Sequence, residues 1–323
     1  MEKRIRIGVL GCASIAERSA IPAILKSAEF KLVAVASRSK EKAERLGSIF
    51  GCAAIHGYEK LIDRSDVDAL YIPLPPALHE EWVLRSIEKK RHVLVEKPLT
   101  IDLDSAVRIV NAATRTGVCV AVNYMFVHHS QHAVVLKLLS DGLIGELRLF
   151  RGTFGFPPRS PDDFRYSKEL GGGALLDAGV YPVRAAQMIL GNGMSVAGAS
   201  LSYNSSDVDV WGSAQLSSPI APAQIAFGFD NFYQCSYELW GSRGRIVVSR
   251  AFTAPVDFSP NLILELSNET RTYSLSPDDH FQRSLAAFAK AIVTEDQASP
   301  YKEMLDHSRL VSEIRRAASV NEN

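Results

Sequence analysis

The chain has 323 residues, of which 46% are hydrophobic and 22% are charged, values that are ordinary for a globular protein. Basic and acidic residues both number 36, so the formal net charge is zero and nothing indicates a nucleic-acid or membrane-surface partner. Because a single core rarely serves a chain of this length, two domains are expected.

The N-terminal part, residues 1–123, alternates between short apolar runs and segments with helical spacing. The predicted strands are 4–11, 31–37, 68–75, 92–98 and 118–124. The predicted helices between them are 14–29, 39–51, 78–91 and 102–117. Strands and helices that alternate in this way favour an α/β fold with a doubly wound parallel sheet.

The pattern changes at about Tyr124, so residues 124–323 are predicted to form a second, α+β domain. After one helix at 130–145, strand-like runs broken by glycine, proline, serine and asparagine predict a large, open, mainly antiparallel sheet. Helical spacing returns at 280–293 and 303–319. Runs such as AQIAFGFD and YQCSYELWGS are expected to leave one apolar sheet face exposed, which favours a homodimer or homotetramer through that face.

The turn after the first strand reads GCASIA, from Gly11 to Ala16. A dinucleotide-binding turn needs a first glycine for the tight bend, a small residue where the backbone approaches the pyrophosphate, and a small residue for helix packing. Gly11, Ala13 and Ala16 occupy these positions, and the helix that follows would direct its positive end at the phosphates. Ser14 and Ile15, which open that helix, are further candidate cofactor contacts. The alternative is an ordinary turn between a strand and a helix.

The end of the second strand indicates which nicotinamide cofactor binds. NAD sites usually place an acidic residue there to accept a hydrogen bond from the ribose 2′-hydroxyl. This chain instead has Ser37 and Arg38, followed by Lys40 and Lys42. A guanidinium and hydroxyl groups suit a 2′-phosphate, so NADP(H) is predicted. The alternative is that these residues only form the solvated start of a helix.

The fourth predicted strand ends in Glu96, Lys97 and Pro98. Ligands of open α/β sheets bind at the carboxyl ends of the strands, so Lys97 is a candidate donor to a carbonyl or hydroxyl oxygen. Pro98 favours an extended conformation at Lys97. Leu74, at the end of the third predicted strand, and Glu96 are candidate cofactor contacts. A solvated loop lysine is the alternative interpretation of Lys97.

The segment GGGALLDAGVYP, residues 171–182, carries one carboxylate and one phenol in an apolar run. Asp177 and Tyr181 are four residues apart, so a helix would present both on one face. Arg165, in the loop before the glycines, is a candidate contact to the cofactor or the substrate. The alternatives are a structural ion pair for Asp177, a packed aromatic for Tyr181 and a surface position for Arg165.

Metal binding and a secreted environment are not expected. His128, His129 and His132 lie close together, but no carboxylate or cysteine completes a ligand set, so no metal is predicted. Four scattered cysteines without a C-x-x-C pair indicate reduced thiols in a cytoplasmic protein. The apolar part of MEKRIRIGVLG is too short for a signal peptide, and no run approaches the length of a membrane span.

Taken together, IGVLGCASIA, EKP and GGGALLDAGVY resemble the Gfo/Idh/MocA oxidoreductases, in the same order and at similar spacing over essentially the whole chain. The resemblance implies an N-terminal Rossmann domain, a C-terminal domain with an open antiparallel sheet, and hydride transfer between NAD(P) and a sugar or polyol carbon. The family lysine falls on Lys97 and the family acid on Asp177. His79 matches the histidine of the family motif P-N-x-x-H, but Pro76 replaces its asparagine, so one cofactor hydrogen bond is in doubt.

Many members carry histidine where this chain has Tyr181, which disfavours an inositol-dehydrogenase-type activity. Tyrosine at this position resembles three branches: glucose–fructose oxidoreductase, dihydrodiol and xylose dehydrogenases, and the sugar 3-ketoreductases of deoxysugar biosynthesis, which are most similar. The resemblance therefore implies that Tyr181 is the general acid, with its pKa lowered by Lys97 nearby, and that Asp177 orients the sugar.

Three hypotheses follow. The first is an NADP(H)-dependent reductase that acts at C3 of a nucleotide-linked keto-deoxysugar. The second is an aldose or trans-dihydrodiol dehydrogenase of the same family. The third is a sensor that binds NADP without catalysis, which the presence of Lys97, Asp177 and Tyr181 disfavours because a sensor needs no proton donor.

Overall fold

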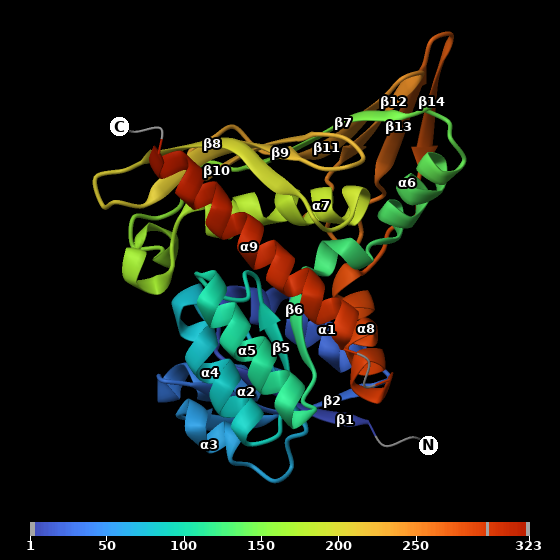
Figure 1. The fold of residues 1–323 in the computed structure, drawn as a ribbon. Helices are drawn as coiled ribbons and strands as arrows, with labels where there is room; N and C mark the ends of the chain where they lie inside the picture. The colour runs from blue at the N-terminus through green and yellow to red at the C-terminus, as the bar shows by residue number, and fades with distance from the viewer. Residues whose placement is uncertain (1–3, 295–296, 321–323) are drawn as a thin grey trace. The chain divides into compact units, whose positions relative to one another are not determined.

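The structure is a computed structural model that describes residues 4–294 and 297–320. The chain packs as two compact units, the first containing Met1–Asn123 with Phe281–Leu305 and the second containing Tyr124–His280 with Asp306–Asn323. The change of unit at Asn123 lies where the strand and helix pattern ends in the sequence. Each unit has its own sheet and its own core (Figure 1).

A parallel six-stranded sheet forms the centre of the first unit. Its strands are β1 (Ile5–Leu10), β2 (Phe30–Ser37), β3 (Ala53–His56), β4 (Ala69–Ile72), β5 (His92–Glu96) and β6 (Val120–Asn123). They are ordered β3-β2-β1-β4-β5-β6, with parallel pairing throughout. This is the Rossmann order, so the predicted doubly wound sheet is confirmed.

Helices connect these strands and cover the sheet. They are η1 (Ala16–Ala20), α1 (Ile21–Lys26), α2 (Lys40–Phe50), α3 (Tyr58–Ile62), η2 (Pro76–Leu78), α4 (His79–Glu88) and α5 (Leu103–Thr116). Local sequence sets several of their ends. Asp102 caps α5 by accepting from the amide of Ser105 at 2.8 Å, and Gly117 ends it in the left-handed region.

Two features of the first unit differ from the expectation. The four-residue strand β3, whose side chains alternate between half-buried and exposed, was not expected because AAIH carries little apolar signal. The C-terminal helices, α8 (His280–Thr294) and α9 (Ala298–Val320), were assigned to the second domain, yet Phe281–Leu305 belongs to the first unit. Phe288 stacks on Phe30 at 5.9 Å, and the Tyr301 hydroxyl donates to the Val118 carbonyl at 2.9 Å. Burial of these aromatic rings explains why the chain returns to the first unit near its C-terminus.

The second unit contains an eight-stranded sheet ordered β14-β13-β12-β11-β7-β10-β9-β8. Its strands are β7 (Leu147–Gly155), β8 (Ser195–Tyr203), β9 (Asp209–Ser217), β10 (Ala223–Gly228), β11 (Gln234–Gly241), β12 (Gly244–Ser249), β13 (Asn261–Leu266) and β14 (Glu269–Ser274). All neighbours pair antiparallel except β7 and β10, which are parallel. The mainly antiparallel sheet is therefore confirmed.

Helices pack on one face of this sheet (Figure 1). They are η3 (Met125–His128), α6 (Ser130–Ser140), η4 (Phe164–Tyr166), η5 (Lys168–Leu170), the π-helix η6 (Leu175–Gly179) and α7 (Val180–Leu190). Phe150, Gly152 and Phe154 of β7 are buried on this side, and Pro182 of α7 approaches Gly152 so closely that a Cβ there would lie 2.9 Å away.

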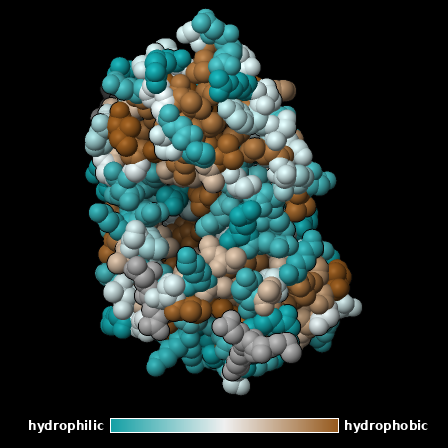
Figure 2. Space-filling model, turned by 90° about the vertical axis from the view of Figure 1, so that its right-hand side faces the viewer, coloured by the Kyte–Doolittle hydropathy of each residue, from teal (hydrophilic) through white to brown (hydrophobic). Residues whose placement is uncertain are grey.

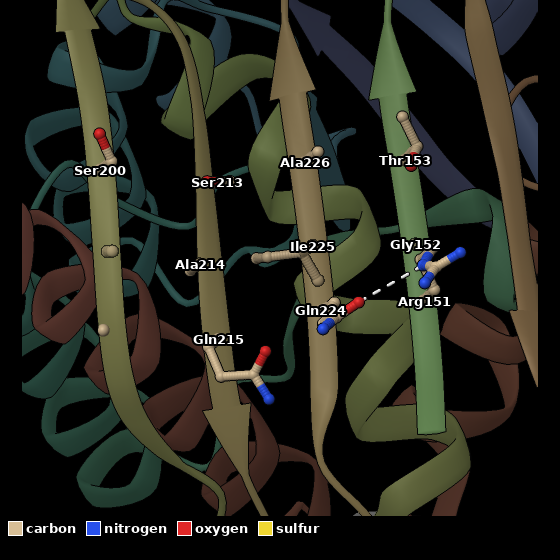
Figure 3. A pocket seen from close by; sticks show the side chains of 12 residues that line it. Arg151, Gly152, Thr153, Ser200, Ser213, Ala214, Gln215, Gln224, Ile225 and Ala226 are labelled. Carbon is tan, nitrogen blue, oxygen red and sulfur yellow. Dashed lines mark hydrogen bonds between the residues drawn. The ribbon is translucent and has the colours of Figure 1, made fainter. Parts of the chain in front are cut away.

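The opposite side of the sheet, called the open face, is more polar than expected. Arg151, Gln215, Gln224 and Thr153 line a shallow groove of about 470 Å³ on it, and their side chains lie across three neighbouring strands (Figure 3). In the run AQIAFGFD the apolar residues alternate inward, so Gln224 is exposed where an apolar face was predicted. Trp211 and Trp240 are also exposed on this side, so the open face carries both polar and apolar side chains.

The surface shows both hydrophilic and apolar residues (Figure 2), as expected for a chain with 46% hydrophobic and 22% charged residues. Figure 2 shows a face on which hydrophilic residues predominate and apolar residues gather in separate groups. Among the described residues, helices that combine the length and the hydropathy needed to cross a bilayer do not occur.

Candidate functional site

The turn after β1 has the geometry that a pyrophosphate-binding loop needs. Gly11 has a φ of +129°, and a Cβ at this position would meet the Leu74 side chain at 2.8 Å. The Ala13 carbonyl accepts from the amides of Ala16 and Glu17, so the helix opens at Ser14 and Ile15, beside this turn. The residues therefore fit a dinucleotide whose phosphates lie at a helix N-terminus.

Ser37 and Arg38 lie at the end of β2, next to that turn. Gly11 donates its amide to the carbonyl of Ala36, which joins the two strand ends. Ser37 is buried and its hydroxyl accepts from the amide of Ser39, whereas the Arg38 side chain is exposed. An exposed guanidinium at this position suits a 2′-phosphate.

A buried carboxylate supports the loop that carries Lys97. Glu96 accepts from the Tyr71 hydroxyl and from the Asn123 side-chain amide, each at 2.7 Å. Asn123 in turn accepts from the Ser284 hydroxyl at 2.8 Å. Burial raises the pKa of Glu96, while these hydrogen bonds oppose the shift. Glu96 is thus placed to position the Lys97 backbone; Tyr71 and Asn123 were not singled out in the sequence.

His79 supports the same loop from the other side. It is fully buried at the start of α4, and its Nδ1 and Nε2 atoms lie 2.8 Å from the carbonyl oxygens of Pro98 and Leu74, respectively. Burial lowers the pKa of His79 to about 4, and the hydrogen bonds to the two carbonyls oppose this shift. The neutral imidazole donates to one of these two carbonyls and lies against the other, so His79 packs between the segments that follow β4 and β5 and supports the cofactor loops.

In the second unit, the three glycines let the backbone pass through a crowded region. Gly172 packs against the carbonyl of Arg165, and Gly173, with a φ of +116°, packs against the carboxylate of Asp209. Asp209 is buried and accepts from the amide of Leu175 at 2.6 Å, which anchors the start of the following helix. Burial raises the pKa of Asp209, and the hydrogen bond from Leu175 opposes the shift. Nothing in the sequence marked Asp209 for this role.

Asp177 and Tyr181 follow on one continuous helical segment that begins as the π-helix η6. Pro182 cannot donate to the preceding turn, which explains why the segment departs from α-helical geometry here. Asp177 is 9% exposed and accepts from Arg165 Nε at 2.6 Å. Burial lowers the pKa of Arg165, but Asp177 and Asp163 more than compensate, so that the guanidinium stays charged. The structure thus joins two predicted site residues, Arg165 and Asp177.

Tyr181 is 6% exposed and is surrounded by aromatic rings. Its ring centroid lies 5.0 Å from Phe154, 5.7 Å from Phe126, 5.9 Å from Phe252 and 6.4 Å from Tyr124. Such surroundings exclude water and strengthen any electrostatic interaction of the phenol.

The buried histidines of the second unit take part in packing. His132 lies 2.9 Å from the Tyr237 hydroxyl and 3.2 Å from the Ala251 carbonyl, and His307 lies 2.7 Å from the Tyr124 hydroxyl and 2.8 Å from Gln187 Oε1. Groups of three or more histidine, cysteine, aspartate or glutamate side chains placed to hold a metal were not found in residues 4–294 and 297–320.

Known proteins resemble both units. A family model described as an oxidoreductase family with an NAD-binding Rossmann fold matches residues 5–124, and the GFO/IDH/MocA C-terminal domain matches residues 132–247. The chain is 47% identical over 294 residues to a dTDP-3,4-didehydro-2,6-dideoxy-alpha-D-glucose 3-reductase from Saccharopolyspora spinosa, covering 90% of this chain and 89% of that one. It is 40% identical over 317 residues to the protein of the same name from Actinomadura kijaniata, covering 97% and 96%.

A solved structure resembles the whole fold. The 3-ketoreductase from Actinomadura kijaniata, crystallised with NADP and TDP-benzene, superposes with a TM-score of 0.95 at 40% identity, covering 98% of each chain. The Rossmann unit and the mainly antiparallel second unit therefore occur together in a relative that holds a nicotinamide cofactor and a thymidine diphosphate derivative.

Proposed function

The chain belongs to the Gfo/Idh/MocA family of oxidoreductases, and from this premise we propose that it reduces the 3-keto group of a nucleotide-linked deoxysugar with NADPH. The observation that carries the proposal is the buried Tyr181, held among aromatic rings on the same helical segment as Asp177. The similarity to named 3-reductases over nearly the whole chain supports this function over an aldose or dihydrodiol dehydrogenase.

The first unit would hold the cofactor. Gly11, Ala13, Ser14 and Ile15 would contact the pyrophosphate, and Ser37 with Arg38 would contact the 2′-phosphate, since no acidic residue follows β2 directly. Leu74 would border the same loops, while Glu96 and His79 would act through the backbone that they position. When bound, NADPH supplies the hydride that adds to the substrate carbon.

Tyr181 would supply the proton. A ketone that accepts hydride needs a proton on its oxygen, and a free phenol, with a pKa of about 10, releases one slowly at neutral pH. A nearby positive charge favours the phenolate and so makes the phenol a better acid. Lys97 is our candidate for that charge and for stabilising the alkoxide that develops. Asp177, which Arg165 holds by its Nε atom, would accept from a sugar hydroxyl.

The test compares NADPH and NADH with a panel of carbonyl substrates. We expect NADPH consumption with a dTDP-linked 3-keto deoxysugar, and little reduction of NADP⁺ when D-xylose is offered for oxidation. A strong preference for NADH would contradict the assignment of Ser37 and Arg38. NADPH binding, seen by fluorescence quenching, without turnover on any carbonyl would favour the sensor.

We also propose that copies of the chain associate through the open face. Trp211 of β9 and Trp240 of β11 point to this face by strand alternation and are 48% and 56% exposed. Tryptophan and arginine are enriched where proteins associate, and small and polar residues around them form a shallow groove (Figure 3). Light scattering should give a dimer or tetramer that the W211K/W240K variant converts to monomer; a wild-type monomer at micromolar concentration would contradict this.

The cysteines support a proposed location in the cytoplasm. All four are free thiols, and burial raises the pKa of Cys52 to about 11 and that of Cys119 to about 12. Such thiols stay protonated and react slowly, which suits a reducing compartment. Fractionation of the source cells with an antibody to the protein would test the location.

A further inference from the structure

Three loops of the second unit leave the sheet at the same end of its strands, and they follow β7, β10 and β12 (Figure 1). These strand ends are neighbours because Gly155 at the end of β7 pairs with Gly228 of β10 and Gln234 of β11, and Ser249 at the end of β12 pairs with Ser236 of β11. The five residues Phe156, Arg159, Phe232, Tyr233 and Arg250 lie on these loops and are called the rim below. None of the five residues belongs to a sequence motif described above.

The rim combines two arginines with three aromatic residues, of which Phe232 is exposed, Tyr233 is half-buried and Phe156 is buried. Arg159 lies 5.0 Å from the ring centroid of Phe156, and Arg250 lies 4.7 Å from that of Tyr233, whose hydroxyl accepts from Arg250 Nη1 at 2.8 Å. Phe232 is 85% exposed, the largest value among the exposed large hydrophobic residues that the structure describes. Its exposed ring offers a face on which a base can stack.

The charge of both arginines is available. Neither Arg159 nor Arg250 forms a salt bridge within residues 4–294 and 297–320, whereas Arg165 nearby is bound by Asp163 and Asp177. Arg250 also has a φ of +52°, which is uncommon for a residue with a side chain and is found at ligand clamps.

Two series of contacts connect the rim with Tyr181. In one, the Tyr181 ring contacts Phe154 at 5.0 Å, Phe154 contacts Phe156 at 5.8 Å, and Phe156 carries Arg159. In the other, Tyr181 contacts Phe252 at 5.9 Å. The neighbouring Thr253 lies 3.2 Å from the Tyr233 hydroxyl, which carries Arg250. The arginines therefore lie outward from the proposed proton donor: Arg159 lies beyond Phe154 and Phe156, and Arg250 lies beyond Phe252, Thr253 and Tyr233.

A nucleotide-linked sugar matches this order. Its diphosphate is attached to C1, two carbons from a reacting C3, and its base lies beyond the diphosphate. We propose that the rim binds the nucleoside diphosphate of the substrate, with Arg159 and Arg250 on the diphosphate and Phe232 stacked on the base. Arginine forms charge-assisted, bidentate hydrogen bonds to phosphate, and every base offers a face to an aromatic ring. This inference rests on the proposed function, because only a nucleotide-linked substrate needs such a subsite.

The experiment measures TDP binding by calorimetry to the full-length protein saturated with NADP⁺. We expect Arg159→Met and Arg250→Met each to weaken binding roughly 10- to 100-fold, and Phe232→Ala roughly 5- to 100-fold. Arg148→Met, at the opposite end of β7, is the matched control and should bind as the wild type does. NADPH binding should be unchanged in all four variants, which shows that they are folded.

The experiment distinguishes failure of the rim assignment from failure of the proposed function. Tight TDP binding by the wild type and by all three rim variants would overturn the rim assignment and leave the proposed function standing. Absence of TDP binding by the wild type, together with turnover only on sugars that lack a nucleotide, would overturn both.

Discussion

Two buried histidines of the second unit should make the protein unstable in mild acid. His132 and His307 are 1% and 5% exposed. Their neutral forms are satisfied: His132 Nε2 can donate to the Ala251 carbonyl while Nδ1 accepts from Tyr237, and His307 Nδ1 can donate to Gln187 while Nε2 accepts from Tyr124. Burial lowers the pKa of each to about 3.

The sign and size of the effect follow from linkage. Each pKa is lower in the folded protein than the value of about 6.5 in an unfolded chain, so the stabilising contribution is complete above that value and is lost as the pH falls. Between about pH 7.5 and about pH 5, each histidine then costs about 2 kcal/mol of unfolding free energy, or about 4 kcal/mol for the pair. That is a large share of the roughly 5–15 kcal/mol by which proteins are usually stable.

The assay is urea unfolding at several pH values for the wild type, His307→Gln and His132→Gln. Each variant should start less stable at neutral pH, because it loses its hydrogen bonds, but should lose about 2 kcal/mol less on acidification than the wild type does. His56→Gln, at an exposed position, controls for loss of an imidazole as such. If both buried-site variants keep the pH dependence of the wild type, the reasoning is refuted.

Three further substitutions test the site. Tyr181→Phe should lower kcat about 10²- to 10⁴-fold and leave the Kd of NADPH nearly unchanged, as measured by steady-state kinetics and fluorescence quenching. Arg38→Glu should raise the KM for NADPH at least about 10-fold while affecting NADH little, with Lys26→Glu as the control. Arg165→Met should cost about 2–3 kcal/mol in urea unfolding because it removes the positive charge that pairs with the buried Asp177 carboxylate, and adding Asp177→Asn should recover part of that loss.

Much of the fold was predictable because its signals are local. Apolar runs of the first 123 residues marked five of the six parallel strands, and helical spacing at 102–117 marked α5. The strand β3 escaped because its side chains are at most half-buried. The return of Phe281–Leu305 to the first unit depends on Phe288 meeting Phe30, a contact between residues far apart in sequence that no local pattern encodes.

The site was predictable to the extent that its residues stand at strand ends or in recognisable turns. Lys97, Asp177 and Gly11 belong to short motifs whose spacing is visible in one sequence. Asp209, Tyr71 and Asn123 were missed because their roles depend on pairing across distant elements, with the Leu175 amide and the Glu96 carboxylate. Asn123 did offer a signal, since it is a polar residue at the end of an apolar strand.

The central claim is hydride transfer from NADPH to C3 of a nucleotide-linked sugar. The most direct test incubates the protein with a dTDP-linked 3-keto deoxysugar and NADPH deuterated at C4 of the nicotinamide, and locates the label in the product by NMR and mass spectrometry. With the deuterium on the transferring face, the label should appear at C3 of the product sugar, and far more slowly with Tyr181→Phe. Oxidation of NADPH without deuterium at C3, or an equal rate with Tyr181→Phe, would contradict the account.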